Sequence, residues 1–152
     1  MRDIVLGAYM NGTVVLMSDV TDEAFASGAL GEGIAIDPSE GKLYAPADGI
    51  VEAVFDTKHA VSLTTLEGAE LLLHVGIDTI RLNGKHFEAC VHAGQQVKRG
   101  DLLLTFDLEA IREEGFSLTT PLAVCNSDDY GTVRPLAGGT VRAGEDLLYL
   151  KG

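Results

Sequence analysis

The residues best suited to chemistry in this sequence are two histidines, His59 and His74. Alternate positions from Val51 to Leu63 carry mainly apolar side chains, a pattern typical of one face of a β-strand, and His59 falls within this series. His74 follows an apolar run that begins at Leu71. Neutral imidazole has a reference pKa of about 6.5, so near neutral pH it can act as a nucleophile, a proton carrier or a metal ligand.

A hairpin that turns around Gly68 would bring these two histidines together. With a two-residue or a four-residue loop, Val61 lies opposite His74, and His59 lies opposite Gly76. The two histidines are then diagonal neighbours on one face, with backbones roughly 7–8 Å apart, so their ring tips can meet. We expect their Nε2 atoms to face each other in a shallow surface depression. A three-residue loop or a bulge would break this register.

The residue pattern leaves three interpretations of the pair open. The first is two core histidines whose nitrogens are satisfied by backbone groups. The second is a zinc site, but zinc needs three or four ligands, and the sequence has no His-x-His or Cys-x-x-Cys; His86 and His92 lie in a separate segment. The third is phosphoryl or proton chemistry, in which one imidazole is the nucleophile and the other donates a hydrogen bond to the phosphoryl oxygens.

Composition and turn signals predict the scaffold that must position the histidines. Eighteen glycines spread among short apolar runs favour an all-β chain with many tight turns. The clearest helix is predicted over residues 108–114, with Asp107 as its N-cap. A helical turn is expected over residues 21–26, capped by Thr21 or Asp22.

Two late segments of the chain echo each other. Residues 94–103 and residues 139–148 both predict a strand, a tight turn and a second strand. This similarity indicates a duplicated β unit within one domain. The chain has 152 residues, about the length of one domain, so a single domain over residues 1–152 is expected.

Charge and hydropathy exclude several classes of partner. The formal net charge is −12 and the pI is near 4.5, so nucleic acid and anionic membranes would be repelled. The acidity suits a basic protein partner, and the alternative is that it only keeps the chain soluble. No apolar run approaches the roughly 18 residues of a membrane span, and no signal peptide follows Met1. Cys90 and Cys125 have no metal or redox spacing, which favours reduced thiols in a cytoplasmic protein, although a disulfide between them stays open.

The stretch Leu73-His74-Val75-Gly76-Ile77-Asp78-Thr79 resembles the signature of the glucose-family enzyme IIA domains of the bacterial sugar phosphotransferase system. The resemblance covers about residues 12–150. Residues 25–30 are most similar to the β-glucoside and sucrose branch. Residues 7–12 depart from the family, whose members often open with a Pro-containing turn. Supporting matches follow at residues 31–36, 44–49, 57–60, 97–101, 106–107 and 120–121.

This resemblance implies an antiparallel β-sandwich or distorted barrel of the duplicated hybrid-motif type, with short helical turns. It implies a cytoplasmic phosphocarrier, an enzyme component that accepts a phosphoryl group from HPr on His74. The group would then pass to a cysteine of a IIB domain of a sugar permease, for coupled sugar uptake and phosphorylation. No cofactor and no metal are implied, because His74 carries the phosphoryl group covalently.

The resemblance also implies roles for individual residues. His74 is the phosphorylated residue, through Nε2, and the Gly76 carbonyl would hold its other nitrogen. His59 is the second active-site histidine, which the Thr57 hydroxyl would orient. Phe25, Phe55 and Leu72 would line an apolar rim, for which ordinary core packing is the alternative. Acidic positions that meet a basic surface on HPr are Asp22 and Asp78.

Two rival functions are kept. A zinc peptidase of the LytM type shares the general β architecture but needs a His-x-His ligand pair, which is missing here. A pure binding module would leave both histidines inert. The transported sugar is not readable from this chain, and neither is whether the chain stands alone or forms part of a larger permease.

Overall fold

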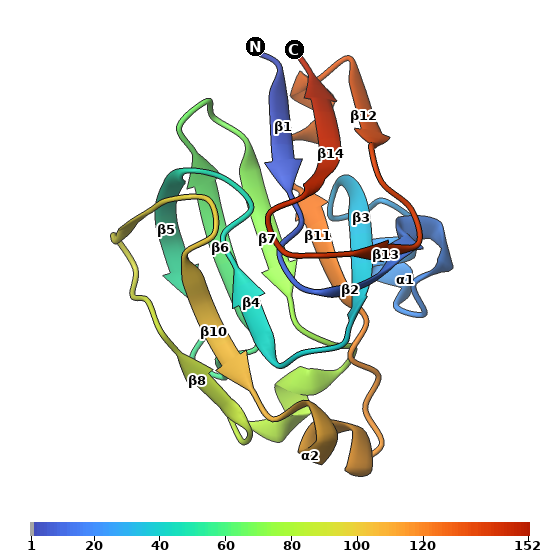
Figure 1. Ribbon diagram of the computed structural model, residues 1–152, viewed down its shortest axis with the longest axis vertical. Helices are drawn as coiled ribbons and strands as arrows, with labels where there is room; N and C mark the ends of the chain where they lie inside the picture. The colour runs from blue at the N-terminus through green and yellow to red at the C-terminus, as the bar shows by residue number, and fades with distance from the viewer. Residues whose placement is uncertain (1) are drawn as a thin grey trace.

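Short antiparallel strands account for most of the regular structure of residues 2–152, the part of the chain that the computed structural model describes (Figure 1). The strands are β1 (Ile4–Gly7), β2 (Gly12–Leu16), β3 (Glu32–Pro38), β4 (Lys42–Tyr44), β5 (Gly49–Val54), β6 (Ala60–Thr65), β7 (Glu70–His74), β8 (Phe87–Ala89), β9 (Gln96–Val97), β10 (Leu102–Phe106), β11 (Thr120–Val124), β12 (Thr132–Pro135), β13 (Thr140–Val141) and β14 (Asp146–Lys151). The helices are α1 (Glu23–Ala26) and α2 (Leu108–Glu113), with short 3-10 turns η1 (Met17–Asp19), η2 (Thr79–Leu82) and η3 (Ser127–Asp129).

The strands form one large sheet and two small ones. The large sheet has the order β13-β2-β3-β11-β7-β6-β5-β9, and the small sheets have the orders β1-β14-β12 and β4-β10-β8. Side chains from all three sheets meet in one continuous buried core, which includes Leu6, Leu43, Leu73 and Leu148. The predicted all-β antiparallel sandwich is therefore confirmed, and its sheets are not closed into a barrel.

The predicted internal repeat is also present. The short strands β9 and β13 form the two opposite edges of the large sheet, while β10 and β14 are the middle strands of the two small sheets. The turns within the two units match in detail. Lys98 N donates to Asp101 Oδ2 at 2.9 Å, and Arg142 N donates to Glu145 Oε1 at 2.6 Å. The similarity between the two segments thus reflects the same turn built twice.

Both predicted helices form, and each begins at an aspartate. The Asp107 side chain accepts from Ala110 N at 3.1 Å at the start of α2. Of the two candidate caps for α1, Asp22 is the one used, because its side chain accepts from Ala24 N at 2.9 Å. A carboxylate at this position also satisfies a free N–H group and complements the helix dipole.

The single strand predicted from Val51 to Leu63 is wrong. A β-bulge interrupts β5 after Val51, and the chain then turns between Phe55 and Ala60, where Phe55 N donates to Ala60 O at 3.0 Å. Lys58 within this turn has a φ of +59°, in the left-handed region. The two halves of the predicted strand are therefore the antiparallel partners β5 and β6, and alternation does not continue through His59.

The predicted register of the next hairpin is also wrong, by one residue. Ala60, and not Val61, lies opposite His74. A three-residue loop follows Thr65, instead of a two-residue or four-residue loop. Gly68 in this loop has a φ of +100°, a conformation that glycine adopts without steric penalty. The extra loop residue shifts every pair of the β6–β7 hairpin.

The β7 strand presents two different faces. Leu71 and Leu73 are buried in the main core, whereas Leu72 and His74 are partly exposed on the outer face of the large sheet. A second, smaller core lies on that outer face. It contains Met17, Val20, Phe25, Ala35 and Ala123. His74 therefore ends a central strand at the edge of a small apolar platform.

Candidate functional site

His59 and His74 lie against each other, as predicted. Their ring centroids are 4.6 Å apart and the ring planes meet at 84°, an edge-to-face arrangement. Val75 N donates to His59 O at 2.7 Å, which ties the two segments together. In the observed register, regular alternation would place His59 on the face opposite to His74. The turn before β6, with left-handed Lys58, is what brings His59 onto the same side.

One hydrogen bond fixes the orientation of His74. Its Nδ1 lies 2.8 Å from the carbonyl oxygen of Gly76. A carbonyl can only accept, so Nδ1 carries the proton and Nε2 of the neutral ring carries the lone pair. His74 is partly exposed. The structure thus presents a neutral imidazole whose free nitrogen is a potential nucleophile.

His59 is held from the other side by Thr57. Thr57 Oγ1 lies 2.6 Å from Nδ1 of His59, so this nitrogen is engaged within the turn. His59 is only 1% exposed. The expectation that both histidines lie open in a surface depression is therefore wrong for His59, because the turn and neighbouring aromatic rings cover it. His74 alone is accessible to a partner.

Burial keeps both histidines neutral. Burial, with a smaller contribution from the neighbouring His74, lowers the pKa of His59 to about 4. Burial also lowers the pKa of His74. The Gly76 carbonyl and the nearby carboxylates of Asp22 and Asp78 act in the opposite direction and raise the pKa of His74.

Aromatic side chains frame the pair, but they are not all exposed as a rim. The ring of Phe25 lies 5.3 Å from that of His74, and the ring of Phe55 lies 5.6 Å from that of His59. Phe25 is buried in the second core, and Leu72 packs against the same core. Only Phe55, at 39%, is strongly exposed. Phe25 is therefore a core residue that also contacts His74.

The two predicted acidic residues flank His74 from different elements. Asp22 caps α1 and is partly exposed. Asp78 immediately precedes η2, is exposed, and has a φ of +60°. Both are near enough for their charge to raise the pKa of His74. The accessible nitrogen therefore lies in a negative environment that favours a cationic partner.

The loop after β7 contains residues that sequence reasoning did not assign. Ile77 N donates to Ser117 O at 3.0 Å, and the Thr79 hydroxyl donates to Val75 O. Thr79 lies within the signature stretch, which gave it no role. Ser117 is forty positions beyond Ile77, and no spacing in the sequence links them. Only the fold places the segment after α2 beside this loop.

Gly76 has no room for a side chain. Its φ is +80°, and a Cβ atom there would lie 2.5 Å from Thr79 Cγ2 and 2.9 Å from Ser117 O. Distances this short do not occur for real Cβ atoms, so the surrounding loop would have to move. Glycine is therefore required to place the carbonyl that accepts from His74.

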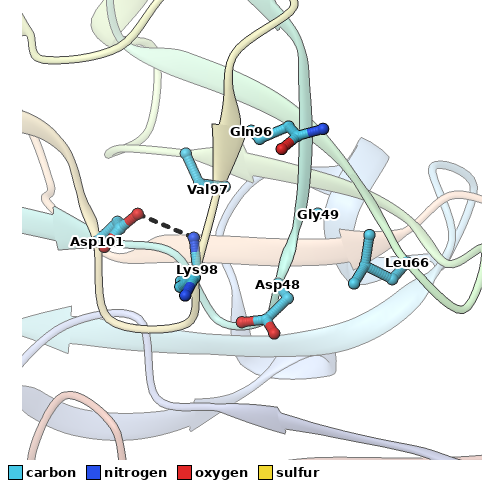
Figure 2. A pocket seen from close by; sticks show the side chains of 7 residues that line it. All are labelled: Asp48, Gly49, Leu66, Gln96, Val97, Lys98 and Asp101. Carbon is cyan, nitrogen blue, oxygen red and sulfur yellow. Dashed lines mark hydrogen bonds between the residues drawn. The ribbon is translucent and has the colours of Figure 1, made fainter.

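A separate pocket of about 370 Å³ lies at the other end of the β6–β7 hairpin (Figure 2). Leu66, in the hairpin loop, is one of its lining residues. Figure 2 also shows Lys98 N donating to Asp101 Oδ2 at 2.9 Å, the turn contact of the internal repeat. Asp48 Oδ1 accepts from Arg99 N at 2.8 Å, so both acidic side chains of this pocket bind the backbone of the same turn. This pocket does not include the histidines.

The structure also bears on the metal site, the disulfide and the membrane-spanning segment considered for this sequence. Among residues 2–152, no group of three or more His, Cys, Asp and Glu side chains is arranged to hold a metal ion. Cys90 and Cys125 are exposed free thiols, so the disulfide left open between them is not formed. Within the described part of the chain, no helix has the length and apolar character needed to cross a membrane.

Residues 4–130 match the model of the family described as "phosphoenolpyruvate-dependent sugar phosphotransferase system, EIIA 1". The beta-glucoside-specific EIIBCA component of Dickeya chrysanthemi is 50% identical over 98% of this chain and 24% of its own length. The glucose-specific EIIA component of Halalkalibacterium halodurans is 43% identical over 97% of this chain and 85% of its own.

A solved structure is similar over nearly the whole chain. Glucose permease IIA from Mycoplasma capricolum superposes with a TM-score of 0.91 at 33% identity, covering 99% of this chain and 97% of that one. The chain spans about a quarter of the length of the β-glucoside relatives it matches, but more than four fifths of the glucose-specific EIIA component.

We predict that Gly76→Ala disturbs His74 as well as stability. Alanine at this φ and the collision of its Cβ atom together should lower the free energy of unfolding by about 1–3 kcal/mol. The displaced Gly76 carbonyl should no longer accept from Nδ1 of His74, so the imidazole proton is no longer confined to Nδ1. Urea unfolding and imidazole ¹⁵N NMR measure the two effects. The matched control is Gly94→Ala, because Gly94 has a φ of +88° but no heavy atom within 4 Å of a Cβ. An unchanged His74 imidazole spectrum in Gly76→Ala would contradict the prediction.

We also predict that His59 makes stability depend on pH. The unfolded chain takes up a proton at His59 near pH 6.5, but the folded chain does so only near pH 4, because its pKa is about 4. This contribution is therefore fully present above pH 6.5, falls as the pH drops, and is lost below about 4. Between pH 7.5 and 4.5, the wild type should lose about 2 kcal/mol more than His59→Gln.

Urea unfolding at several pH values measures this difference. The control is His92→Gln, at an exposed histidine, which should keep the wild-type dependence. Equal losses in the wild type and in His59→Gln would mean that His59 is not held neutral by burial.

Proposed function

Since this chain belongs to the EIIA 1 family of the phosphoenolpyruvate-dependent sugar phosphotransferase system, we propose that His74 is the residue on which it carries the phosphoryl group. As a family member the chain is a phosphotransferase component. The observation that supports His74 is its hydrogen bond to the Gly76 carbonyl. That bond commits the proton to Nδ1 and leaves Nε2, on the accessible ring, as the nucleophile.

The proposed reaction has two transfers. The Nε2 lone pair of His74 attacks the phosphorus atom on phosphorylated HPr, the bond from phosphorus to HPr breaks, and a P–N bond forms on His74. The thiolate of a IIB-domain cysteine then attacks the same phosphorus atom, and the P–N bond breaks. Each step passes through a loose, in-line transition state, so the protein contributes positioning and electrostatics.

His59 acts as the donor beside the nucleophile. Its ring is neutral, so only one nitrogen carries a proton. Thr57 Oγ1 lies 2.6 Å from Nδ1, and a hydroxyl can donate to this nitrogen or accept from it. In the proposed mechanism the hydroxyl donates, which leaves the proton of His59 on Nε2, from where it donates to a phosphoryl oxygen held on His74. Such a charge-assisted hydrogen bond stabilises the transferring group without adding a positive charge to the resting site.

The surroundings of His74 suit docking of protein partners. Asp22 and Asp78 supply negative charge at the rim, and the exposed ring of Phe55 supplies an apolar contact. Phe25 belongs to the second core beside His74, and Leu72 packs against the same core. The same nitrogen must be reached first by HPr and then by the IIB domain. An accessible histidine at the end of a strand allows both partners to reach it in turn.

Further properties follow from this proposal. The phosphoryl group is bound covalently, so no separate cofactor takes part. Residues 1–152 act as one EIIA domain, on the cytoplasmic side where HPr is found. The IIB domain belongs to a sugar permease, and the membrane part of that permease selects the sugar.

We predict that His74 becomes phosphorylated when the chain is mixed with phosphoenolpyruvate, enzyme I and HPr. Intact mass spectrometry should show the addition of one phosphoryl group, and mild acid should remove it, because phosphohistidine is acid-labile. His74→Ala should not be labelled, whereas His92→Ala, at an exposed histidine elsewhere, should be labelled like the wild type. Normal labelling of His74→Ala would refute the assignment.

We predict that transfer from HPr is steered by charge. The second-order rate should fall as salt rises, because the Debye length is about 10 Å at 0.1 M and contracts further above that. The double variant Asp22→Asn with Asp78→Asn should be slower at low salt by roughly tenfold and less sensitive to salt. Asparagine also caps helices, so α1 is kept.

Stopped-flow or quench-flow measurement across a salt series gives both quantities. Glu88→Gln is the control, since it removes an exposed negative charge on β8, which belongs to the small β4-β10-β8 sheet and not to the large sheet that carries His74. A wild-type rate that is the same at low and moderate salt would rule out electrostatic steering.

A further inference from the structure

The peptide unit between Gly76 and Ile77 is held at both of its polar ends. Its carbonyl oxygen accepts from Nδ1 of His74 at 2.8 Å, and its N–H donates to Ser117 O at 3.0 Å. A rotation of this unit would therefore break two hydrogen bonds at once. The orientation of the His74 ring depends on the orientation of this one peptide plane.

The loop that contains this peptide has two left-handed residues in three positions. Gly76 has a φ of +80°, and Asp78, two residues later, has a φ of +60°. Glycine adopts this conformation freely and aspartate more readily than most residues, so the loop can follow this path without strain. Which way the Gly76 carbonyl points then depends on the side chains that pack against the loop.

Thr79 makes contacts of this kind with the loop. It is fully buried, and its hydroxyl donates to the carbonyl of Val75. Its methyl carbon Cγ2 lies directly beside Gly76, at 2.5 Å from the position of a Cβ atom there. Val75 N in turn donates to His59 O at 2.7 Å. The Thr79 side chain thus supports both Val75, which joins the two histidine segments, and Gly76, which orients His74.

We propose that Thr79 is a positioning residue for the phosphoryl-accepting histidine. Its hydroxyl and methyl group hold Val75 and Gly76 so that the Gly76 carbonyl points at His74, which keeps the proton on Nδ1 and the lone pair on Nε2. Thr79 does not touch the phosphoryl group. The effect of Thr79 on the rate of phosphoryl transfer rests on the proposed role of His74. Its effect on the tautomer of His74 does not depend on that role.

The test separates the two groups of the Thr79 side chain. Thr79→Val removes the hydroxyl and keeps the branched shape, and Thr79→Ser keeps the hydroxyl. If valine crowds the loop and prevents folding, Thr79→Ala removes the hydroxyl without added volume. The matched control is Thr65→Val, because Thr65 is a buried threonine whose hydroxyl accepts from Ala69 N at the far end of the β6–β7 hairpin.

Two readouts are measured on each variant. Long-range ¹H–¹⁵N NMR of the imidazoles reports the tautomer of His74 without any phosphoryl donor, and quench-flow reports the rate of phosphoryl transfer from HPr. Thr79→Val should show a mixture of His74 tautomers and transfer about tenfold more slowly, since a misplaced nucleophile loses rate steeply. Thr79→Ser keeps the hydroxyl bond and should retain more of the Nδ1–H tautomer and of the rate than Thr79→Val, and the loss that remains measures the contribution of the methyl group. Thr65→Val should lose stability but keep both.

The outcomes distinguish this proposal from the proposed function. A wild-type His74 tautomer in Thr79→Val and Thr79→Ala would overturn the positioning role, whatever the rate. The same tautomer mixture in Thr65→Val would overturn it too, because general destabilisation would then explain the effect. If the wild type is not phosphorylated on His74, the proposed function fails, and the tautomers still decide the role of Thr79.

Discussion

The hydrogen bond from Nδ1 of His74 to the Gly76 carbonyl is the interaction on which the site depends. Because a carbonyl only accepts, this bond assigns the proton to Nδ1 and leaves the lone pair on Nε2. The geometry around it follows from that constraint. Gly76 has no room for a side chain, its peptide is held by Ser117 O, and Thr79 lies against it. A loop of ordinary residues in ordinary conformations would not present the oxygen in this direction.

Neutrality is the second requirement, and burial supplies it. Removing an imidazole from water makes its charged form costly, and two imidazolium rings with centroids 4.6 Å apart would in addition repel each other. The pKa of His59 is therefore about 4, and that of His74 is also lowered. Asp22 and Asp78 partly oppose this for His74. The site is thus a pair of uncharged histidines within an acidic surface. Such a surface repels an anionic phosphoryl group unless a cationic partner is present.

The scaffold keeps this pair rigid by placing it in the middle of the large sheet. β6 and β7 are inner strands, and the two repeated units put the short strands β9 and β13 at the outer edges. The main core lies between the sheets, while the small second core around Phe25 lies on the outer face beneath His74. Packing on both faces fixes the end of β7, and the accessible nitrogen is therefore carried by the least mobile kind of element.

The sequence alone determined the all-β class, the internal repeat, both helices, the Asp107 cap of α2 and the closeness of His59 to His74, because apolar periodicity, glycine positions and capping residues act locally. Between Thr21 and Asp22 as the cap of α1, the structure decided. It did not determine the register. The three-residue loop at Gly68 and the turn at Lys58 each shift the alternation, and the two errors offset each other, so the histidines met for a different reason than the one predicted. The burial of His59 and the contacts of Ser117 and Thr79 with the loop were decided only by tertiary structure, since they join segments whose proximity no local pattern encodes.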